Sequence, residues 1–281
     1  MENFDLEQFL KYAIAEDVGD GDHTSLSTIP TTATGKARLL VKDNGIIAGI
    51  DEAKRVFELI DADLKFEQIL QDGAKVQHGD VAFFVSGKSQ SIVTAERLAL
   101  NIMQRMSGIA TQTAKITSMI SHTKCKLLDT RKTTPGFRYF EKRAVVLGGG
   151  VNHRIGLYDM ILVKDNHIDY AGGVNEALSK IKEYLEVNKK NLKVEVEARS
   201  LEDVKLILEN GLAFRILLDN FTVEQMKEAV SYINGRVQTE ASGGIHEGNV
   251  VAYAETGVDY ISMGALTHQI KSLDLSLKAV K

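Results

Sequence analysis

The stretch KVEVEARSLEDVKLILENGLAFRILLDN, residues 193–220, decides the fold class of this 281-residue chain. It begins with an apolar run and continues with a helical pattern that places Val204 and Ile207 on one face. It ends in a second apolar run. Similar runs begin at Val237 (VQTEA) and Asp259 (DYISM), so the unit recurs about every 22 residues. A strand, a helix and a second strand at this spacing are typical of parallel βα units.

The segments between these runs carry the signals of helix ends. Ser200 and Thr222 are cap-type residues followed by acidic first turns, and Gly211 lies where the first helix should stop. Two more apolar runs, 126–130 (KLLDT) and 159–165 (DMILVKD), bring the predicted strands to six. We predict an α/β protein with an irregular (β/α) barrel, and a doubly wound open sheet is the alternative.

The first hundred or so residues follow a different pattern. Segments 36–50 and 65–86 have the character of β-hairpins, and residues 51–60 form an amphipathic helical pattern. A long helix is expected over about 94–120, with one apolar stripe. This region is predicted to be a separate, smaller α+β domain, with its boundary in or beside the long helix.

Composition restricts the class of protein. The net charge is −4, whereas nucleic-acid binders usually have a basic excess. The single cysteine, Cys125, excludes an internal disulfide and fits a reducing compartment. No window approaches the roughly 18 apolar residues of a membrane span, and residues 1–19 are too acidic for a secretory signal. We expect a cytoplasmic protein with neither a nucleic-acid nor a membrane partner.

Polar residues occur at the ends of all six predicted strands. They are Asp129–Lys132, Lys164–His167, Glu195 and Glu197, Asp219 and Asn220, Glu240–Gly244, and Ser262–Gly264. In a (β/α) barrel the active site lies at the C-terminal ends of the strands. So many charges at these positions favour an enzyme.

Cationic residues concentrate between the first two predicted strands. They are Arg131, Lys132, Arg138, Lys142, Arg143, His153, Arg154 and Lys164. In an acidic protein this local excess predicts an anionic ligand. Arg131, Lys132 and Lys164 are the best candidates because they lie directly at strand ends. Lys142 and Arg143 fall in the helical stretch 137–147 and are expected to form a solvated basic face.

The ends of the last two strands predict a phosphate site. Ser242, Gly243 and Gly244 follow one strand and precede a helix expected over 246–257, and Gly264 follows the other. Glycines 148–150 are either part of this chemistry or simply a helix stop.

Two carboxylates on adjacent strands, Glu197 and Asp219, are suited to Mg²⁺ and substrate phosphates. The alternative is a structural ion pair with a lysine of the barrel.

These motifs resemble the quinolinate phosphoribosyltransferase family (nicotinate-nucleotide pyrophosphorylase, carboxylating). The matching stretches are EDVGDGDHTS (16–25), TAERLALNIMQRMSGIAT (94–111), LDTRKTTPGFRYFEKRAVVLGGGVNHRIGLYDMILVKDNHI (128–168), VEVE (194–197), LLDN (217–220), EASGGI (240–245) and YAETGVDYISMGALTH (253–268). They run in order over nearly the whole chain. Phe137 and Arg143 depart from the pattern, where Leu and Tyr are expected.

The resemblance implies three regions. They are an N-terminal α/β sandwich domain (1–110) that includes the start of the long linking helix, a seven-stranded barrel-like catalytic domain (111–267), and a C-terminal tail (268–281) that could pack back on the N-terminal domain. It also implies a homodimer whose partner completes each site, without deciding whether dimers assemble further. The implied reaction, in de novo NAD biosynthesis, converts quinolinate and phosphoribosyl pyrophosphate to nicotinate mononucleotide, pyrophosphate and CO₂ with Mg²⁺.

The resemblance also implies a role for each candidate residue. The substrate carboxylates would be held by Arg131, His153, Arg154 and Lys164, with Thr130 and Lys132 nearby and Arg97 from the neighbouring subunit. The catalytic set would be Lys132, Lys164, Glu197 and Asp219, of which the two carboxylates face the ribose and the metal, directly or through water. Phosphate would be bound by Ser242, Gly243, Gly244 and Gly264, with His268 lining that end.

Other readings remain open at this stage. A paralogue linked to molybdenum uptake shares the implied fold. A Schiff-base lyase could use Lys164 as its nucleophile. A phosphosugar sensor could keep the pocket without turnover. The turn-rich segment 72–80 (DGAKVQHGD) is similar to hairpins of lipoyl-type carriers, but we expect a structural role for it.

Overall fold

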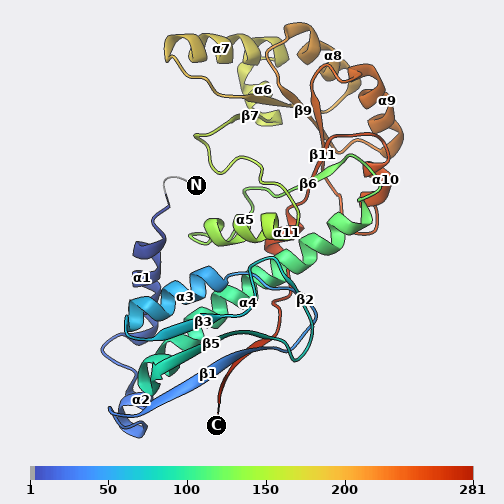
Figure 1. Cartoon of the computed structure of the whole chain (residues 1–281). Coiled ribbons are helices and arrows are strands. Elements are labelled where there is room, and N and C mark those ends of the chain that lie inside the picture. Colours follow the sequence, from blue (N-terminus) through green and yellow to red (C-terminus); the bar gives the residue numbers. More distant parts are fainter. Residues whose placement is uncertain (1–3, 281) are drawn as a thin grey trace. The chain divides into compact units, whose positions relative to one another are not determined.

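The computed structural model describes residues 4–280, which divide into two compact units. Unit 1 contains the residues up to Ala114, Thr133–Gly149 and the residues from Leu266 on. Unit 2 contains Lys115–Lys132 and Gly150–Ala265. Figure 1 shows a mainly antiparallel sheet with helices in unit 1 and a parallel sheet with outer helices in unit 2.

The main sheet of unit 1 has four strands in the order β12-β1-β5-β3. They are β1 (Thr34–Val41), β3 (Lys65–Gln68), β5 (Val81–Lys88) and β12 (Leu275–Ala279), and all neighbours are antiparallel. The chain end therefore pairs with a strand from its beginning, with Val41 opposite Leu275. The hairpin expected over 36–50 is wrong, because β2 (Gly45–Ile46) pairs with β4 (Lys75–Val76) instead of β1.

The helices of unit 1 surround a hydrophobic core. They are α1 (Leu6–Val18), α2 (His23–Thr28), α3 (Ile50–Ile60), α4 (Ser89–Met119, which continues into unit 2), α5 (Arg138–Leu147) and the short α11 (Ala265–His268). On α4, Ile102, Met106 and Ile109 are buried as the apolar stripe predicts, whereas Arg97 is exposed. The long helix is confirmed, although it begins five residues before the expected start at Thr94.

Helix α5 does not have the solvated basic face that we expected. Lys142 is fully buried, and Arg143 is turned toward acidic side chains. The Arg143 guanidinium lies 2.6 Å from Asp51, 3.2 Å from Glu52 and 3.3 Å from Asp72. The prediction fails because α5 packs within unit 1 against the start of α3, and a buried cation is retained where carboxylates accompany it.

The sheet of unit 2 is parallel throughout, in the order β6-β11-β10-β9-β8-β7. Its strands are β6 (Lys126–Leu128), β7 (Ile161–Val163), β8 (Val194–Ala198), β9 (Arg215–Asp219), β10 (Gln238–Ser242) and β11 (Tyr260–Ser262). All six predicted strands are present. The resemblance implied seven strands; besides these six, Val151 makes one isolated parallel bridge to Leu128. In the described chain β7 pairs with β8 alone, so the barrel is not closed.

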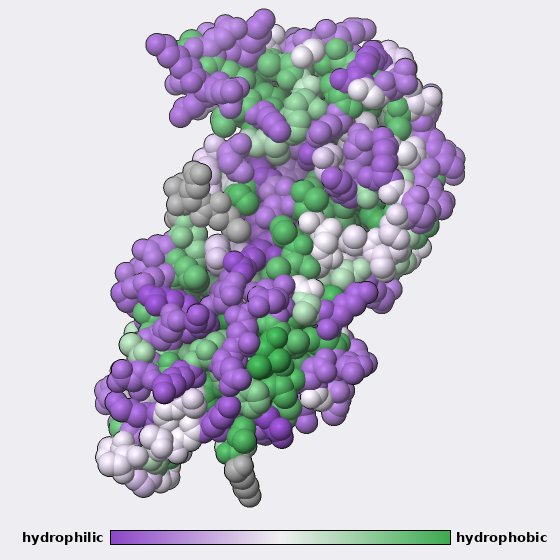
Figure 2. Space-filling model, in the orientation of Figure 1, coloured by the Kyte–Doolittle hydropathy of each residue, from purple (hydrophilic) through white to green (hydrophobic). Residues whose placement is uncertain are grey.

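Helices connect these strands as the sequence indicates. They are α6 (Asp165–Ala171), α7 (Val174–Val187), α8 (Leu201–Asn210), α9 (Val223–Ile233) and α10 (Val250–Ala254). Ser200 caps α8 by accepting from Asp203 N, and Gly211 ends it in the left-handed conformation (φ 76°). In Figure 2 the outer helices of unit 2 present mainly hydrophilic residues to solvent.

Helix α10 is shorter than the predicted 246–257. The side chain of Asn249 accepts from His246 N at 2.8 Å, and this contact holds the preceding residues in a turn. Within residues 4–280, no helix combines the length and apolar character that crossing a membrane requires.

Candidate active site

A cavity of about 320 Å³ opens at the C-terminal ends of the strands of unit 2. Its lining residues are Thr130, Arg131, Lys132, His153, Arg154, Leu162, Lys164, Leu217, Glu240, Ser242 and Ser262. Seven of the predicted site residues therefore meet in one pocket, although they come from four parts of the sequence. They meet because parallel strands bring their C-terminal ends to the same edge of a sheet.

Two arginines give the pocket its cationic character. Burial lowers the pKa of Arg154, and the positive charge of Arg131 lowers it further, so the two guanidinium groups repel each other. Arg154 is held in place by its Nη1, which donates to the carbonyl oxygen of Met160 at 3.2 Å. A site that keeps two cations together is arranged to receive an anion.

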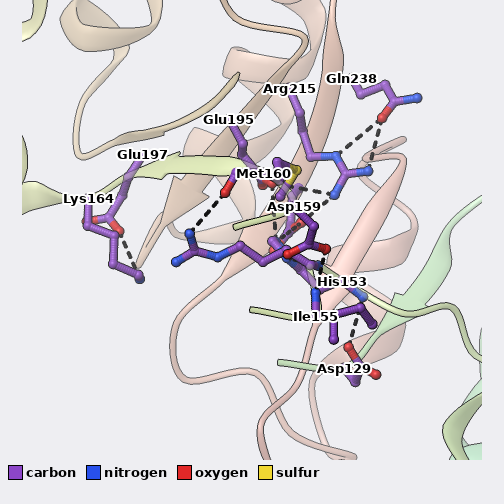
Figure 3. Close-up of polar contacts among 12 residues, drawn as sticks. Asp129, His153, Ile155, Asp159, Met160, Lys164, Glu195, Glu197, Arg215 and Gln238 are labelled. Carbon is purple, nitrogen blue, oxygen red and sulfur yellow. Dashed lines mark hydrogen bonds and ion pairs between the residues drawn. The ribbon is translucent and has the colours of Figure 1, made fainter. Parts of the chain in front are cut away.

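Lys164 and Glu197 meet at the ends of the neighbouring strands β7 and β8. Lys164 Nζ lies 3.3 Å from Glu197 Oε2, and Asp165 N donates to Oε1 at 3.2 Å (Figure 3). Burial raises the pKa of Glu197, and the negative charge of Asp219 on β9 adds to this effect although Lys164 opposes it. Glu197 and Asp219 thus form a pair of carboxylates beside the cationic pocket.

The glycine segment after β10 approaches the end of β9 closely. Gly243 and Gly244 have φ values of +91° and +61°, which L-residues with side chains rarely adopt. A Cβ at Gly243 would collide with the Asn220 side chain and come within 2.8 Å of Asn220 N. Asn220 N also donates to Ser242 O at 2.9 Å. The two glycines therefore leave the backbone at this strand end without side chains of its own, so that N–H groups can approach an anion. The helix that was expected directly after them begins only at Val250.

A buried charged network lies beneath the pocket. His153 Nε2 is 3.2 Å from Glu195 Oε2 and 3.4 Å from Glu240 Oε2, while Arg215 Nη1 lies 3.0 Å from the same Glu240 oxygen. Burial raises the pKa of Glu195 to about 7, and the charge of Glu240 adds to it. Figure 3 shows His153, Glu195 and Arg215 converging on one point.

Sequence reasoning counted Glu195 and Glu240 among the polar strand-end residues but gave them no specific role, and it did not single out Arg215. The available signal was their position inside otherwise apolar strand runs, since a charged residue on a buried strand needs a partner. The partner could not be identified because the register of the strands was unknown.

The other predicted site residues lie outside the pocket lining. Glu197, Asp219, Gly243, Gly244 and Gly264 belong to unit 2 at or just beyond the strand ends. Arg97 on α4 and His268 on α11 belong to unit 1, and both are exposed. The roles given to Arg97 and His268 stay predictions.

Comparisons with known proteins show which family this chain resembles. Models of the C-terminal and N-terminal domains of quinolinate phosphoribosyl transferase match residues 109–278 and 22–107. Quinolinate phosphoribosyltransferase (decarboxylating) 1b of Nicotiana tabacum is 47% identical over 98% of this chain and 82% of its own. The chloroplastic nicotinate-nucleotide pyrophosphorylase (carboxylating) of Arabidopsis thaliana is 46% identical over 98% of this chain and 83% of its own.

A solved structure shares the architecture as well as the sequence. NadC from Streptococcus pyogenes superimposes with a TM-score of 0.93 at 37% identity, covering 98% of this chain and 97% of that one. Together with the two domain models, this similarity extends over both units. The chain belongs to the quinolinate phosphoribosyltransferase family.

Proposed function

We propose that this protein transfers the phosphoribosyl group of phosphoribosyl pyrophosphate to quinolinate, releasing pyrophosphate and CO₂ and forming nicotinate mononucleotide. The observation that carries the proposal is the convergence of Arg131 and Arg154 in one pocket, with Lys132 and Lys164 on its walls. Quinolinate has two neighbouring carboxylates, and two guanidinium groups at one site match such a dianion.

The carboxylates at the pocket edge suit the transfer step. As pyrophosphate leaves the ribose, positive charge develops at the anomeric carbon, and the ring nitrogen of quinolinate forms the new bond there. Glu197 and Asp219 can stabilise that charge, while Lys132 and Lys164 attract the anionic groups of the two substrates. Phosphate binding by Ser242–Gly244 is part of the proposal, and it is supported by the two glycines at positive φ, whose backbone carries no side chain.

Mg²⁺ is part of the proposal. Glu197 and Asp219 fit this ion, because they supply the hard oxygen ligands that Mg²⁺ prefers. The negative charges of the two carboxylates also repel each other, and a divalent cation bound between them would relieve that repulsion. These two residues would hold the ion directly or through water. When bound with the substrate phosphates, it would neutralise charge on the leaving pyrophosphate.

Decarboxylation then needs no organic cofactor. Once the ring nitrogen is ribosylated it is cationic, so the bond from ring carbon 2 to its carboxylate can break with the electron pair left on that carbon. CO₂ departs and carbon 2 takes up a proton. The arginines contribute by orienting the two carboxylates of the substrate.

The assembly and location belong to the same proposal. Arg97 is exposed on α4, and in a homodimer with shared sites it would contact quinolinate bound to the partner. Mixing Arg97→Ala and Glu197→Gln subunits should then restore activity that each variant lacks alone. A cytoplasmic location is favoured by the single buried Cys125, although the Arabidopsis relative is named chloroplastic, and cell fractionation would decide it.

The experiment that tests the reaction is a product assay. Purified protein, phosphoribosyl pyrophosphate and Mg²⁺ are mixed with either quinolinate or nicotinate, and mononucleotide and CO₂ are quantified. Mononucleotide and CO₂ in equal amounts from quinolinate, with no product from nicotinate, are expected. Absence of product from quinolinate would overturn the proposal.

A further inference from the structure

The buried network beneath the pocket spans three neighbouring strands in register. Arg215, the first residue of β9, is paired with Glu195 of β8 on one side and Gln238 of β10 on the other. Its Nε and Nη2 donate to Gln238 Oε1 at 3.3 Å and 3.1 Å, and its guanidinium lies over the Tyr260 ring, 4.1 Å from the centroid. Arg215 is therefore fixed in the sheet and does not line the pocket.

The network continues from Arg215 to the pocket through two contacts. Arg215 Nη1 donates to Glu240 Oε2 at 3.0 Å, and the same oxygen faces His153 Nε2 at 3.4 Å. On the opposite side of the ring, His153 Nδ1 accepts from the backbone N–H of Arg154 at 2.7 Å. Asp129 accepts from His153 N at 2.8 Å and anchors the backbone just before it.

These contacts use both ring nitrogens of His153. Its side chain is 6% exposed, with Nε2 turned to the carboxylates and Nδ1 turned to the backbone. His153 is thus arranged to orient Arg154, whereas the resemblance implied that it holds a substrate carboxylate itself. The side chain of Arg154 lines the pocket.

Two influences act on the protonation of this ring. Burial opposes a charge on His153, but the hydrogen bonds to Glu195 and Glu240 outweigh it and raise its pKa to about 9. The Arg154 N–H acts in the other direction, because a protonated Nδ1 cannot accept a hydrogen bond. Two N–H groups cannot face each other at 2.7 Å, so the contact from Arg154 N requires an unprotonated Nδ1.

We propose that Arg215 and Glu240 are positioning residues that fix His153 as the tautomer protonated at Nε2, so that Nδ1 holds the backbone of Arg154 and aims its guanidinium into the pocket. This rests on the proposed function, because the anion that Arg154 receives is taken to be quinolinate. Arg215 lies outside the pocket lining and acts on the substrate only through Glu240, His153 and Arg154.

The first test is ¹⁵N NMR of the intact protein labelled on histidine, at neutral pH and without ligand. The His153 signals are identified by their loss in His153→Asn. We expect a protonated Nε2 and an unprotonated, hydrogen-bonded Nδ1. A ring protonated at both nitrogens would overturn the inference, and this result would not depend on whether quinolinate is the substrate.

The second test is kinetic and uses Arg215→Lys, which keeps the charge and loses the planar fork. We expect the KM for quinolinate to rise about 10-fold, because one group that binds quinolinate is misplaced. The KM for phosphoribosyl pyrophosphate should stay within about twofold of the wild-type value. Arg236→Lys is the matched control, because Arg236 also lies over a tyrosine, Tyr232, but outside the network. Equal changes in both KM values, or no change, would show that Arg215 does not act through Arg154.

The third test compares two replacements of His153. Asparagine can place an oxygen near Nδ1 and keep the contact to Arg154, whereas glutamine reaches the Nε2 position and loses that contact. The KM for quinolinate should rise at least several-fold more in His153→Gln than in His153→Asn. An equal rise of the KM for quinolinate in both variants would favour direct binding of the substrate by His153. Wild-type protein that is inactive with quinolinate would instead refute the proposed function.

Discussion

The Nζ of Lys164 and the Oε2 of Glu197 lie 3.3 Å apart across the ends of β7 and β8. The lysine side chain is half exposed, whereas the glutamate is almost fully buried. Burial raises the pKa of Glu197, whereas the positive charge of Lys164 lowers it. The pair thus joins the cationic wall of the pocket to its acidic edge.

Replacing Glu197 by glutamine should lower kcat by about 10²- to 10³-fold, because a group that stabilises charge formed only in the transition state affects kcat more than KM. Glu202→Gln on α8 is the control, since Glu202 pairs with Lys205 at the surface. Steady-state kinetics checks this. A fall in binding of both substrates with kcat unchanged would contradict the assigned role.

Arg131→Ala should raise the KM for quinolinate by about 10²-fold, because the loss of one charge-assisted partner of a carboxylate costs about 2–3 kcal/mol. Arg154 then remains as the single guanidinium group of the pocket, without the neighbour that lowers its pKa. Initial rates at varied quinolinate give the answer, with Arg236→Ala as the control. An unchanged KM would remove Arg131 from the binding site.

Gly243→Ala should raise the KM for phosphoribosyl pyrophosphate by at least about 10-fold, because a Cβ there displaces Asn220 and adds strain at positive φ. Gly211→Ala is the matched control. Gly211 also has a positive φ, +76°, but an added Cβ meets nothing within 4 Å, so stability alone should fall, by about 1 kcal/mol. If both variants bind the substrate equally well, the glycine segment does not contact phosphate.

Glu52→Gln should flatten the pH dependence of the free energy of unfolding. Burial raises the pKa of Glu52 to about 7 in the folded protein, against 4.5 ordinarily. Its contribution is fully present below about pH 4.5 and is lost as the pH rises through 7, because the unfolded chain gives up the proton first. Between pH 4.5 and pH 7, the free energy of unfolding of the variant should rise relative to that of the wild type by at most about 3 kcal/mol.

Urea unfolding at pH 4.5 and pH 8 measures this difference. Glu58→Gln is the control because it lies on the same helix, paired with Arg55 at the surface. The control should follow the wild type at both pH values. If the free energies of unfolding of Glu52→Gln and the wild type differ by the same amount at both pH values, the pKa of Glu52 is not raised in the folded protein.

Much of the fold and of the pocket could be predicted from the sequence. The recurrence of apolar runs and capped helices located all six strands of unit 2, because periodicity and end signals are local properties of the chain. The residues after those strands, such as Arg131 and Lys164, could be assigned to one site, since parallel strands end at one edge.

Pairings between distant segments could not be predicted. Strand β1 pairs with β12 and with β5. No local pattern in the sequence distinguishes these two partners from β2, which is nearer along the chain. Lys142 looked like a solvated residue, because its spacing on a helix says nothing about what packs against that helix.

The sequence by itself therefore determined the parallel βα class, the separate N-terminal region and the anion-binding character of the strand ends. The tertiary structure alone decided that the barrel stays open and that Arg143 meets Glu52. It also decided that Arg215, Glu240 and His153 form one chain of contacts beneath the pocket. The physical reason is that helix and strand signals arise from neighbouring residues, whereas a buried charge is satisfied by whichever side chain the register brings to it.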